Sequence, residues 1–481
     1  MRNKLGQVGL IIAGIVIGVA ISLNFSAVAQ RESAARQPLP LPIEELRAFT
    51  EVFGRVKKDY VEPVEDKKLI TEAINGMLTG LDPHSAYLDQ EAFKEMQVGT
   101  QGEFGGLGIE VGMEDGFVKV ISPIDDTPAS RAGVMAGDLI VKLDDNSVKG
   151  MTLNDAVKQM RGRPNTPIRL TIVRKGEPNP IELTLTRAVI KIQSVKATTL
   201  EPGYAYFRVT QFQEGTGELL ANAIEAHVKG PMKGIILDLR NDPGGLLNSA
   251  VAVTATFIES GKLVVYTDGR AEDSKMRLNA SPEHYLRGRN RQDYLAKLPP
   301  EIKKLPMVVL VNGGSASASE IVAGALQDYG RAVIMGQQTF GKGSVQTILP
   351  LGNNTAIKLT TARYYTPNGR SIQAKGIMPD IPLESAIDKN ASLRLREADL
   401  SKHLDDGKPA AAPESKDSKE LEKVKALAAA RAKYNFEPEA RPEIDPKELR
   451  PEAGQVVSKK DYELNQAIAF LKSRGATAGG K

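Results

Sequence analysis

The chain has 481 residues, no cysteine and a nearly balanced charge of +4 at pH 7. A chain of this length forms roughly two to four domains with sizeable cores. The absence of cysteine excludes disulfides, thiolate metal sites, cysteine nucleophiles and a lipid-modified N-terminal cysteine. Because basic residues are interleaved with acidic ones, the sequence indicates no nucleic-acid partner.

Residues 1–29 have the composition of an export segment. Arg2 and Lys4 precede an apolar run at residues 8–25, and Ala27 and Ala29 fit the A-x-A form of a signal-peptidase site. The run is also close to the length of a membrane span, so a cleaved signal peptide and an uncleaved anchor are both open. In either case we expect export to a bacterial periplasm, and an uncleaved segment would anchor the protein to the inner membrane.

Residues 41–96 show helical periodicity. Two apolar stripes predict two or three helices that serve packing or dimerisation. The residues 82–85 (DPHS) form a predicted turn, and a lone histidine in such a turn, His84, is expected to be structural. The stripes are formed by Leu46, Phe49, Phe53, Val56 and Tyr60, and by Leu69, Ile70, Ala73, Ile74, Met77, Leu78 and Leu81.

Residues 97–187 change to short strands and glycine turns. The stretches 105–111 (GGLGIEV) and 132–140 (AGVMAGDLI) resemble those of a PDZ domain. The N–H groups of a glycine loop can bind a terminal carboxylate, while the following edge strand accepts a peptide as an added strand. A β-rich domain without peptide binding is the alternative. The expected peptide-binding residues are Gly106, Leu107, Gly108, Ile109 and Val157, the last on a predicted helix at 154–161.

Residues 188–385 alternate between predicted strands and helices. This alternation predicts parallel strand pairing and a layered α/β body. A turn at residues 242–245 leaves the carboxyl end of a buried strand, where such sheets commonly bind ligands. Residues 386–481 are predicted to form a polar linker and then a helical tail. We expect the terminal helix at 461–473 to be an interaction element outside the catalytic core.

The strongest chemical signal is a serine after a buried strand. The apolar run 308–311 breaks at residues 312–314 (NGG), and a helix follows within a few residues. Ser317 then lies at a helix N-terminus, where unpaired N–H groups and the helix dipole favour developing negative charge. However, Ser317 and Glu320 also fit the capping box S-x-x-E. Taken alone, these residues favour the cap.

A lysine is the candidate base. None of the four histidines lies in a motif suited to activating Ser317, and a lysine can act as a base if desolvation lowers its pKa by several units. Lys342 lies between two glycines, with Phe340 as apolar cover. If its segment is extended, Lys342 and Gln346 share one face, and the amide could orient the amine. Taken alone, a solvated strand lysine is the usual case.

The stretches 314–321 (GSASASEI) and 339–346 (TFGKGSVQ) together resemble the signature of the carboxyl-terminal processing, or tail-specific, serine proteases. The stretches 238–245 (DLRNDPGG) and 82–85 (DPHS) fit the same family, as does the order of export segment, helical region, PDZ domain and α/β body. The resemblance implies a crotonase/ClpP-like body, no metal or organic cofactor, self-association and docking to an envelope adaptor. The residues it implies are Ser317 as nucleophile, Lys342 as general base, Gln346 as its orienter, and an oxyanion hole from Gly244 or Gly245 and Ala318.

The sequence therefore predicts an exported endopeptidase with a Ser/Lys dyad, whose PDZ domain binds protein substrates with apolar C-termini. Two alternatives remain open. The first is a non-catalytic envelope scaffold, in which the PDZ domain binds C-termini and Ser317 only caps a helix. The second is a histidine-dependent serine protease, which would tolerate replacement of Lys342.

Overall fold

The computed structural model describes residues 41–124, 127–287, 292–383, 396–405, 428, 432–440, 442 and 455–478. The predicted export segment at residues 1–29 and most of the predicted linker after residue 385 lie outside these ranges. Within the described ranges, no helix combines the length and the apolar character that crossing a membrane requires.

The first unit of the chain, residues 1–74, contains helix α2 (Ile43–Asp59) and the start of α3 (Asp66–Thr79). Acidic residues in the first turn of α2 and basic residues in its last turn complement the helix dipole. None of the residues of α2 is buried, and Phe49 and Val52 are 46% and 60% exposed. The predicted helices are thus present, and Leu46 and Phe49 of the predicted apolar stripe of α2 are exposed among the described residues.

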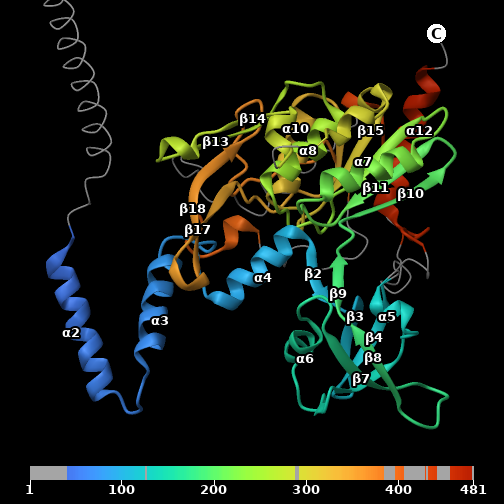
Figure 1. The fold of residues 1–481 in the computed structure, drawn as a ribbon. Coiled ribbons are helices and arrows are strands. Elements are labelled where there is room, and N and C mark those ends of the chain that lie inside the picture. The colour runs from blue at the N-terminus through green and yellow to red at the C-terminus, as the bar shows by residue number, and fades with distance from the viewer. Residues whose placement is uncertain are drawn as a thin grey trace, which may run out of the picture. The chain divides into compact units, whose positions relative to one another are not determined.

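The second unit begins with the end of α3 and contains a β-rich domain (Figure 1). Its sheet has the order β3-β4-β5-β7-β8, with β6 beside β5, so that β3 lies at an edge. Val118, Ile140 and Leu170 are fully buried in its core. The elements are β1 (Ala86–Leu88), α4 (Gln90–Gln101), β2 (Glu103–Gly106), β3 (Ile109–Glu114), β4 (Phe117–Pro123), α5 (Pro128–Arg131), β5 (Leu139–Leu143), β6 (Asn146–Ser147), α6 (Leu153–Met160), β7 (Pro167–Val173), β8 (Ile181–Thr186) and β9 (Ala188–Lys191).

The α/β body is built on a six-stranded sheet in the order β10-β11-β12-β15-β16-β19. All neighbouring pairs are parallel except β10 with β11. Every residue of β12 and β15 is buried, as expected for strands covered on both faces. The predicted parallel, layered body is confirmed. Its elements are β10 (Val195–Glu201), β11 (Tyr204–Val209), α7 (Thr216–His227), β12 (Gly234–Asp238), α8 (Leu247–Phe257), α9 (Pro282–Tyr285), β15 (Met307–Val311), α10 (Ala318–Asp328), β16 (Val333–Gly336) and β19 (Ile381–Pro382).

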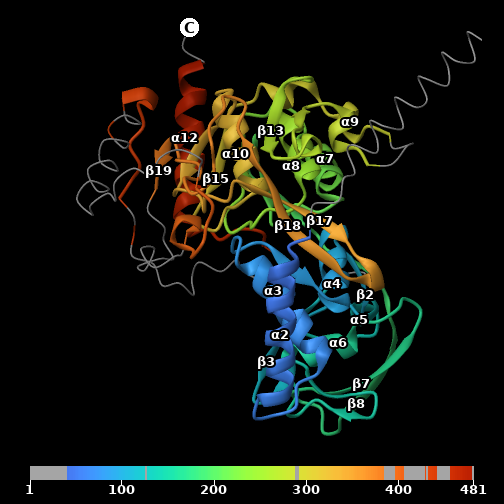
Figure 2. The same ribbon diagram turned by 90° about the vertical axis from the view of Figure 1, so that its left-hand side faces the viewer.

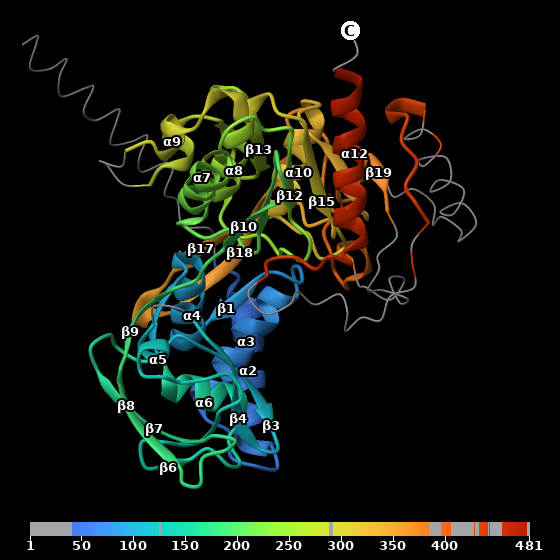
Figure 3. The same cartoon turned by 90° about the vertical axis from the view of Figure 1, so that its right-hand side faces the viewer.

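Helices cover both faces of this sheet. Ile235 and Leu237 of β12 belong to the core shared with α7, α8 and α10, whereas Ile236 belongs to a second core with helix α12 (Tyr462–Ala478). Figure 3 shows α12 on one face and the other three helices on the opposite face. The expectation that the terminal helix lies outside the catalytic core is therefore wrong. Its apolar stripe, which includes Leu464 and Leu471, completes the sheet's second core.

A second, antiparallel sheet packs beside the first and has the order β1-β18-β13-β14, with β17 paired to β18. Figure 2 shows β17 and β18 side by side as a long hairpin. This hairpin carries Ser344 and Gln346, so the second sheet supplies one wall of the candidate site. Its strands are β13 (Leu263–Gly269), β14 (Arg277–Asn279), β17 (Ser344–Pro350) and β18 (Ala356–Tyr365).

Candidate active site

Ser317 lies in the turn that joins β15 to α10, as predicted. Its backbone has φ 55° and ψ −111°, a conformation that a residue with a side chain rarely adopts. Such strain costs about 1–3 kcal/mol and persists only where the surroundings enforce it. Ser317 lines a cavity, and it also begins a capping box with Glu320, whose Oε2 accepts the Ser317 N–H. Ser317 therefore occupies the predicted helix-cap position and lines the cavity at the same time.

Glu320 connects the serine turn to the lysine segment. Its Oε2 accepts the N–H groups of Ser317 at 2.8 Å and of Lys342 at 2.9 Å. Because both backbone nitrogens bond to one oxygen, they lie within about 6 Å of each other. Oε1 accepts the Gly341 N–H at 2.7 Å and the Thr339 hydroxyl. Glu320 is fully buried, and this burial raises the pKa of its carboxyl to about 7.

Lys342 lies two residues before β17 and lines the same cavity as Ser317. Burial lowers the pKa of the Lys342 amine, and the positive charge of Lys358 lowers it further, against the opposing effect of nearby carboxylates such as Glu397. Within the described residues, the Lys342 amine forms no ion pair or hydrogen bond. Lys342 is half-buried, and a lysine in such a place without a carboxylate partner loses its proton more readily than an exposed lysine.

Gln346 lines the cavity, but its amide is bonded elsewhere. Nε2 donates to Ser344 Oγ at 3.0 Å and to Thr360 Oγ1 at 3.3 Å. A β-bulge between Val345 and Gln346 interrupts the strict alternation on which the shared-face argument rested. Among the described contacts, the amide therefore orients Ser344 rather than the Lys342 amine.

The predicted oxyanion loop lies directly against Ser317. Gly244 and Gly245 have φ 95° and 147°. A Cβ on Gly244 would lie 2.8 Å from Ala318 N and 2.9 Å from Ser317 Cβ, so only glycine fits there. The Gly244 N–H is occupied, because Asp242 Oδ1 accepts it at 2.8 Å. Among the described contacts the N–H groups of Gly245 and Ala318 have no acceptor, so these two are the better oxyanion donors.

Asp242 fixes this loop from inside. Its backbone oxygen accepts the Ala316 N–H at 3.0 Å and the Ser319 hydroxyl at 2.9 Å, which ties the loop to the start of α10. The carboxyl of Asp242 is buried, and burial raises its pKa to about 7.

Ser317, Lys342, Gln346 and both glycines open onto one cavity of about 850 Å³. Phe93 and Met96 of α4 and Ile348 of β17 give the cavity an apolar wall, whereas Arg287 is a charged residue at its lining. The cavity is large enough for several residues of an extended peptide. Within the described part of the chain, no group of three or more histidine, aspartate or glutamate residues could hold a metal ion.

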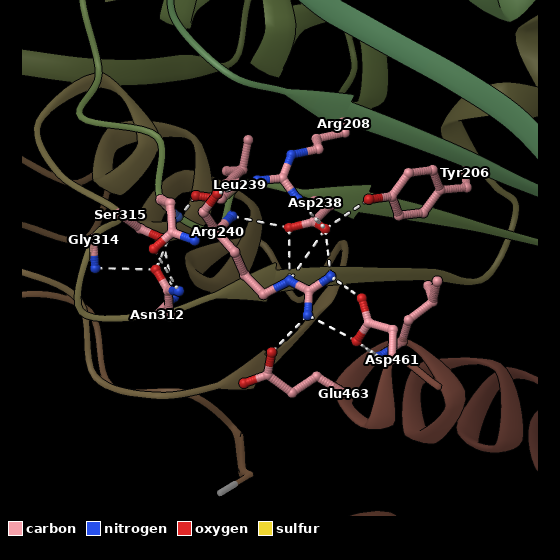
Figure 4. Close-up of polar contacts among 12 residues, drawn as sticks. Tyr206, Arg208, Asp238, Leu239, Arg240, Asn312, Gly314, Ser315, Asp461 and Glu463 are labelled. Carbon is pink, nitrogen blue, oxygen red and sulfur yellow. Dashed lines mark hydrogen bonds and ion pairs between the residues drawn. The ribbon is translucent and has the colours of Figure 1, made fainter. Parts of the chain in front are cut away.

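An ion network lies behind the oxyanion loop, and sequence reasoning did not assign it a role. Figure 4 shows the Arg240 guanidinium between Asp238 of β12 and two carboxylates of the terminal segment, Asp461 and Glu463. Burial opposes ionisation of Asp238, but Arg240 holds the pKa of that carboxyl below its usual value. The sequence signal was limited to the stretch DLR at residues 238–240, since the two acidic partners are remote in sequence.

His84 is paired with a carboxylate in this structure. Its Nε2 lies 2.8 Å from Oε2 of Glu397, and Glu397 Oε1 accepts the Gln373 amide at 2.9 Å. Gln373 Oε1 in turn accepts the Gly343 N–H at 2.9 Å. His84 does not line the cavity that contains Ser317. It therefore supports the lysine segment from behind, which fits the structural role expected for it.

The candidate peptide-binding residues lie together in the β-rich domain. Gly106 ends β2, and Gly108 has φ 76° at the turn into β3. The Gly108 oxygen accepts the Thr127 hydroxyl at 3.1 Å, which fixes this turn. Leu107 is buried in the core, and Ile109 and Val157 pack against it from β3 and α6. Within the described residues, the outer edge of β3 is unpaired, so it is open to an added strand.

Comparison with known proteins identifies three regions of the chain. Residues 203–383 match peptidase family S41, residues 105–185 match the PDZ domain, and residues 18–92 match the activating protease CtpB N-terminal domain. Among solved structures, the photosystem II D1 C-terminal processing protease is 30% identical, covers 72% of this chain and 89% of that chain, and has a TM-score of 0.40.

Two curated relatives are similar over most of their length. The carboxy-terminal-processing protease of Bartonella bacilliformis is 48% identical over 396 residues, which are 81% of this chain and 87% of that protein. The carboxy-terminal processing protease CtpA of Bacillus subtilis is 33% identical over 80% of this chain and 78% of that protein. The resemblance found in the sequence is confirmed, and the chain belongs to the carboxy-terminal processing proteases of peptidase family S41.

Proposed function

We propose that this peptidase is an exported serine endopeptidase that cleaves with a Ser317/Lys342 dyad and binds the C-termini of its substrates in its PDZ domain. One observation supports the dyad above all others. A single buried oxygen, Glu320 Oε2, holds the backbones of both residues, and both residues line the same cavity.

The chemistry follows from these positions. The neutral Lys342 amine takes the proton of the Ser317 hydroxyl while Oγ attacks the peptide carbonyl carbon. The tetrahedral oxyanion accepts hydrogen bonds from the N–H groups of Gly245 and Ala318. The protonated amine then gives its proton to the leaving nitrogen, and an acyl-enzyme remains. Lys342 next takes a proton from water, whose oxygen attacks the ester carbon. As the C–Oγ bond breaks and the acid leaves, the amine returns this proton to Ser317 Oγ.

The PDZ domain would supply substrate selection. An edge strand, a glycine turn and apolar side chains at Leu107, Ile109 and Val157 suit an extended chain end with an apolar last residue. We further propose a periplasmic location with residues 1–29 as signal or membrane anchor, on the basis of their sequence. The exposed apolar residues of α2 support self-association, and an envelope adaptor is the other partner that we propose.

A peptide with an apolar C-terminus and a fluorescent reporter of cleavage tests the proposal. Wild-type protein and the exposed-lysine control Lys229→Ala should cleave it, whereas Ser317→Ala and Lys342→Ala should lose at least about 10³-fold in kcat while still binding the peptide. Binding without cleavage by the wild type would favour the non-catalytic scaffold. Activity that survives Lys342→Ala but disappears on replacement of a histidine would favour a histidine-dependent protease.

A further inference from the structure

The two acidic residues at the start of helix α12 contact the segment that carries the oxyanion loop. Arg240 Nη1 lies 2.9 Å from Asp461 Oδ1 and 2.6 Å from Glu463 Oε2, and Nη2 lies 2.7 Å from Asp461 Oδ2. Arg240 is only 7% exposed. Charge-assisted, bidentate bonds of this kind are among the strongest polar contacts in a protein.

Helix α12 supplies two of the three carboxylates in this network, which also contains two guanidinium groups. Asp238 binds Arg240 through Nε at 3.0 Å and Nη2 at 2.6 Å, and it also accepts the Tyr206 hydroxyl at 2.7 Å. Arg208 lies 3.5 Å from the same carboxylate and donates to the Arg240 backbone oxygen at 3.2 Å. Without the α12 carboxylates, two guanidinium groups would share one aspartate, which is an unfavourable arrangement in a buried site.

The network is continuous with the catalytic loops. Asn241, with φ 56°, follows Arg240 directly, and its N–H and side chain bond to the Asn312 amide at 2.9 and 3.0 Å. Asn312 leads to Ser315, whose hydroxyl donates to the Leu239 oxygen at 2.8 Å. Figure 4 shows Asn312 and Ser315 on one side of Arg240 and the two α12 carboxylates on the other side. A displacement of Arg240 is therefore transmitted both to Gly244 and Gly245 and to the turn before Ser317.

We propose that Asp461 and Glu463 are positioning residues for catalysis, which fix the oxyanion loop through Arg240. The terminal helix is in this sense part of the catalytic machinery, although it contributes no residue to the described lining of the cavity. The inference rests on the proposed dyad for its kinetic consequence. Its structural consequence, a fixed loop at residues 241–245, can be measured without any activity.

The test compares the double variant Asp461→Asn and Glu463→Gln with the matched control Lys472→Ala. Asparagine preserves the helix cap, since Asp461 Oδ1 accepts the Leu464 N–H at 3.0 Å. Lys472 also anchors α12, through a 2.7 Å ion pair with Glu201 of β10, but its contact is remote from Arg240. The control therefore perturbs the docking of the helix without touching the network.

In the double variant, hydrogen exchange of the Asn241 and Gly244 amides should become at least tenfold faster, and kcat should fall about tenfold or more, with KM within twofold. Lys472→Ala should leave exchange and kcat within twofold of wild type. The proposal is overturned if hydrogen exchange at these amides is unchanged in the folded double variant. It is also overturned if the loss of kcat is no larger than the fraction of the variant that is unfolded. If the double variant does not fold, Glu463→Gln alone is judged by the same two criteria. Failure of the dyad itself would appear separately, as Ser317→Ala retaining activity.

Discussion

Replacement of Glu320 by glutamine is the sharpest perturbation of the site, because it keeps the shape of the side chain and removes one acceptor oxygen. The carboxylate accepts four hydrogen bonds, three of them from backbone N–H groups. An amide nitrogen cannot accept any of them. The amide nitrogen can take the place of either oxygen, and the place of Oε1 is the less costly one. There it faces the Thr339 hydroxyl, which can rotate, and only the buried N–H of Gly341 loses its acceptor. The loss of that acceptor costs about 1–3 kcal/mol.

The pH dependence of this cost has a definite sign. Burial raises the pKa of Glu320 from 4.5 to about 7, so ionisation of this group disfavours the folded state. Protonated Glu320 therefore contributes to the free energy of unfolding. This contribution is fully present below pH 4.5 and is lost as the pH rises through 7. This difference between the unfolded-state and folded-state pKa of Glu320 corresponds to about 3 kcal/mol in the free energy of unfolding. At pH 5 Glu320 is neutral, and its hydroxyl oxygen still has a lone pair for the Gly341 N–H, which an amide nitrogen lacks. Glutamine does not titrate. We therefore expect Glu320→Gln to be about 1–3 kcal/mol less stable than wild type at pH 5 and to lose that deficit by pH 8.

Activity should behave differently from stability. At pH 8, where the variant is folded, kcat should still fall at least tenfold, because a shift of about 1 Å between nucleophile and base can cost about 10²-fold. The measurements are urea unfolding at pH 5 and 8 and steady-state cleavage at pH 8. Glu225→Gln, an exposed position on α7, serves as the control. If Glu320→Gln kept wild-type kcat, or if its stability deficit grew with pH, this account of the carboxylate would be wrong.

Three further predictions concern the loop, the base and the terminal helix. Gly244→Ala places a methyl group 2.8 Å from Ala318 N, so kcat should fall at least about 10²-fold with peptide affinity retained, as measured by cleavage and by titration of binding. Lys358→Gln removes a cation that lowers the pKa of Lys342, so the rise of kcat/KM with pH should move to higher pH; an unchanged or lower midpoint would contradict this. Leu471→Ala truncates a side chain that is 1% exposed and should lower the free energy of unfolding by about 2–5 kcal/mol, measured by urea unfolding.

Local patterns sufficed to predict the strand and the helix that flank Ser317. The apolar run before Asn312, the small-residue turn and the helix after Ser317 all lie within about twenty residues, and their signals are propensity and periodicity. The bulge beside Gln346 was not predictable, since it depends on pairing with β18. As a result, alternation placed the Gln346 amide toward Lys342, whereas the structure bonds it to Ser344 and Thr360.

Tertiary contacts account for the rest of what the sequence did not predict. The S-x-x-E signal identified Glu320 as a cap residue, but its bonds to residues 339–342 depend on a segment some twenty residues away. The partners Arg240 and Asp461 are separated by 221 positions, and no local pattern connects them. The apolar stripe of the terminal helix was visible in the sequence. Periodicity shows that such a stripe must be covered, but it does not show what covers it.

The place of α12 has a consequence for biosynthesis. The helix is the last described element of the chain, and it covers Tyr206, Ile236 and Leu310 on one face of the central sheet. Until α12 has left the ribosome, that face is bare, and Arg240 lacks two of its acidic partners. The second core of the sheet therefore cannot form before α12 is synthesised, and a chain truncated before α12 would expose an apolar surface.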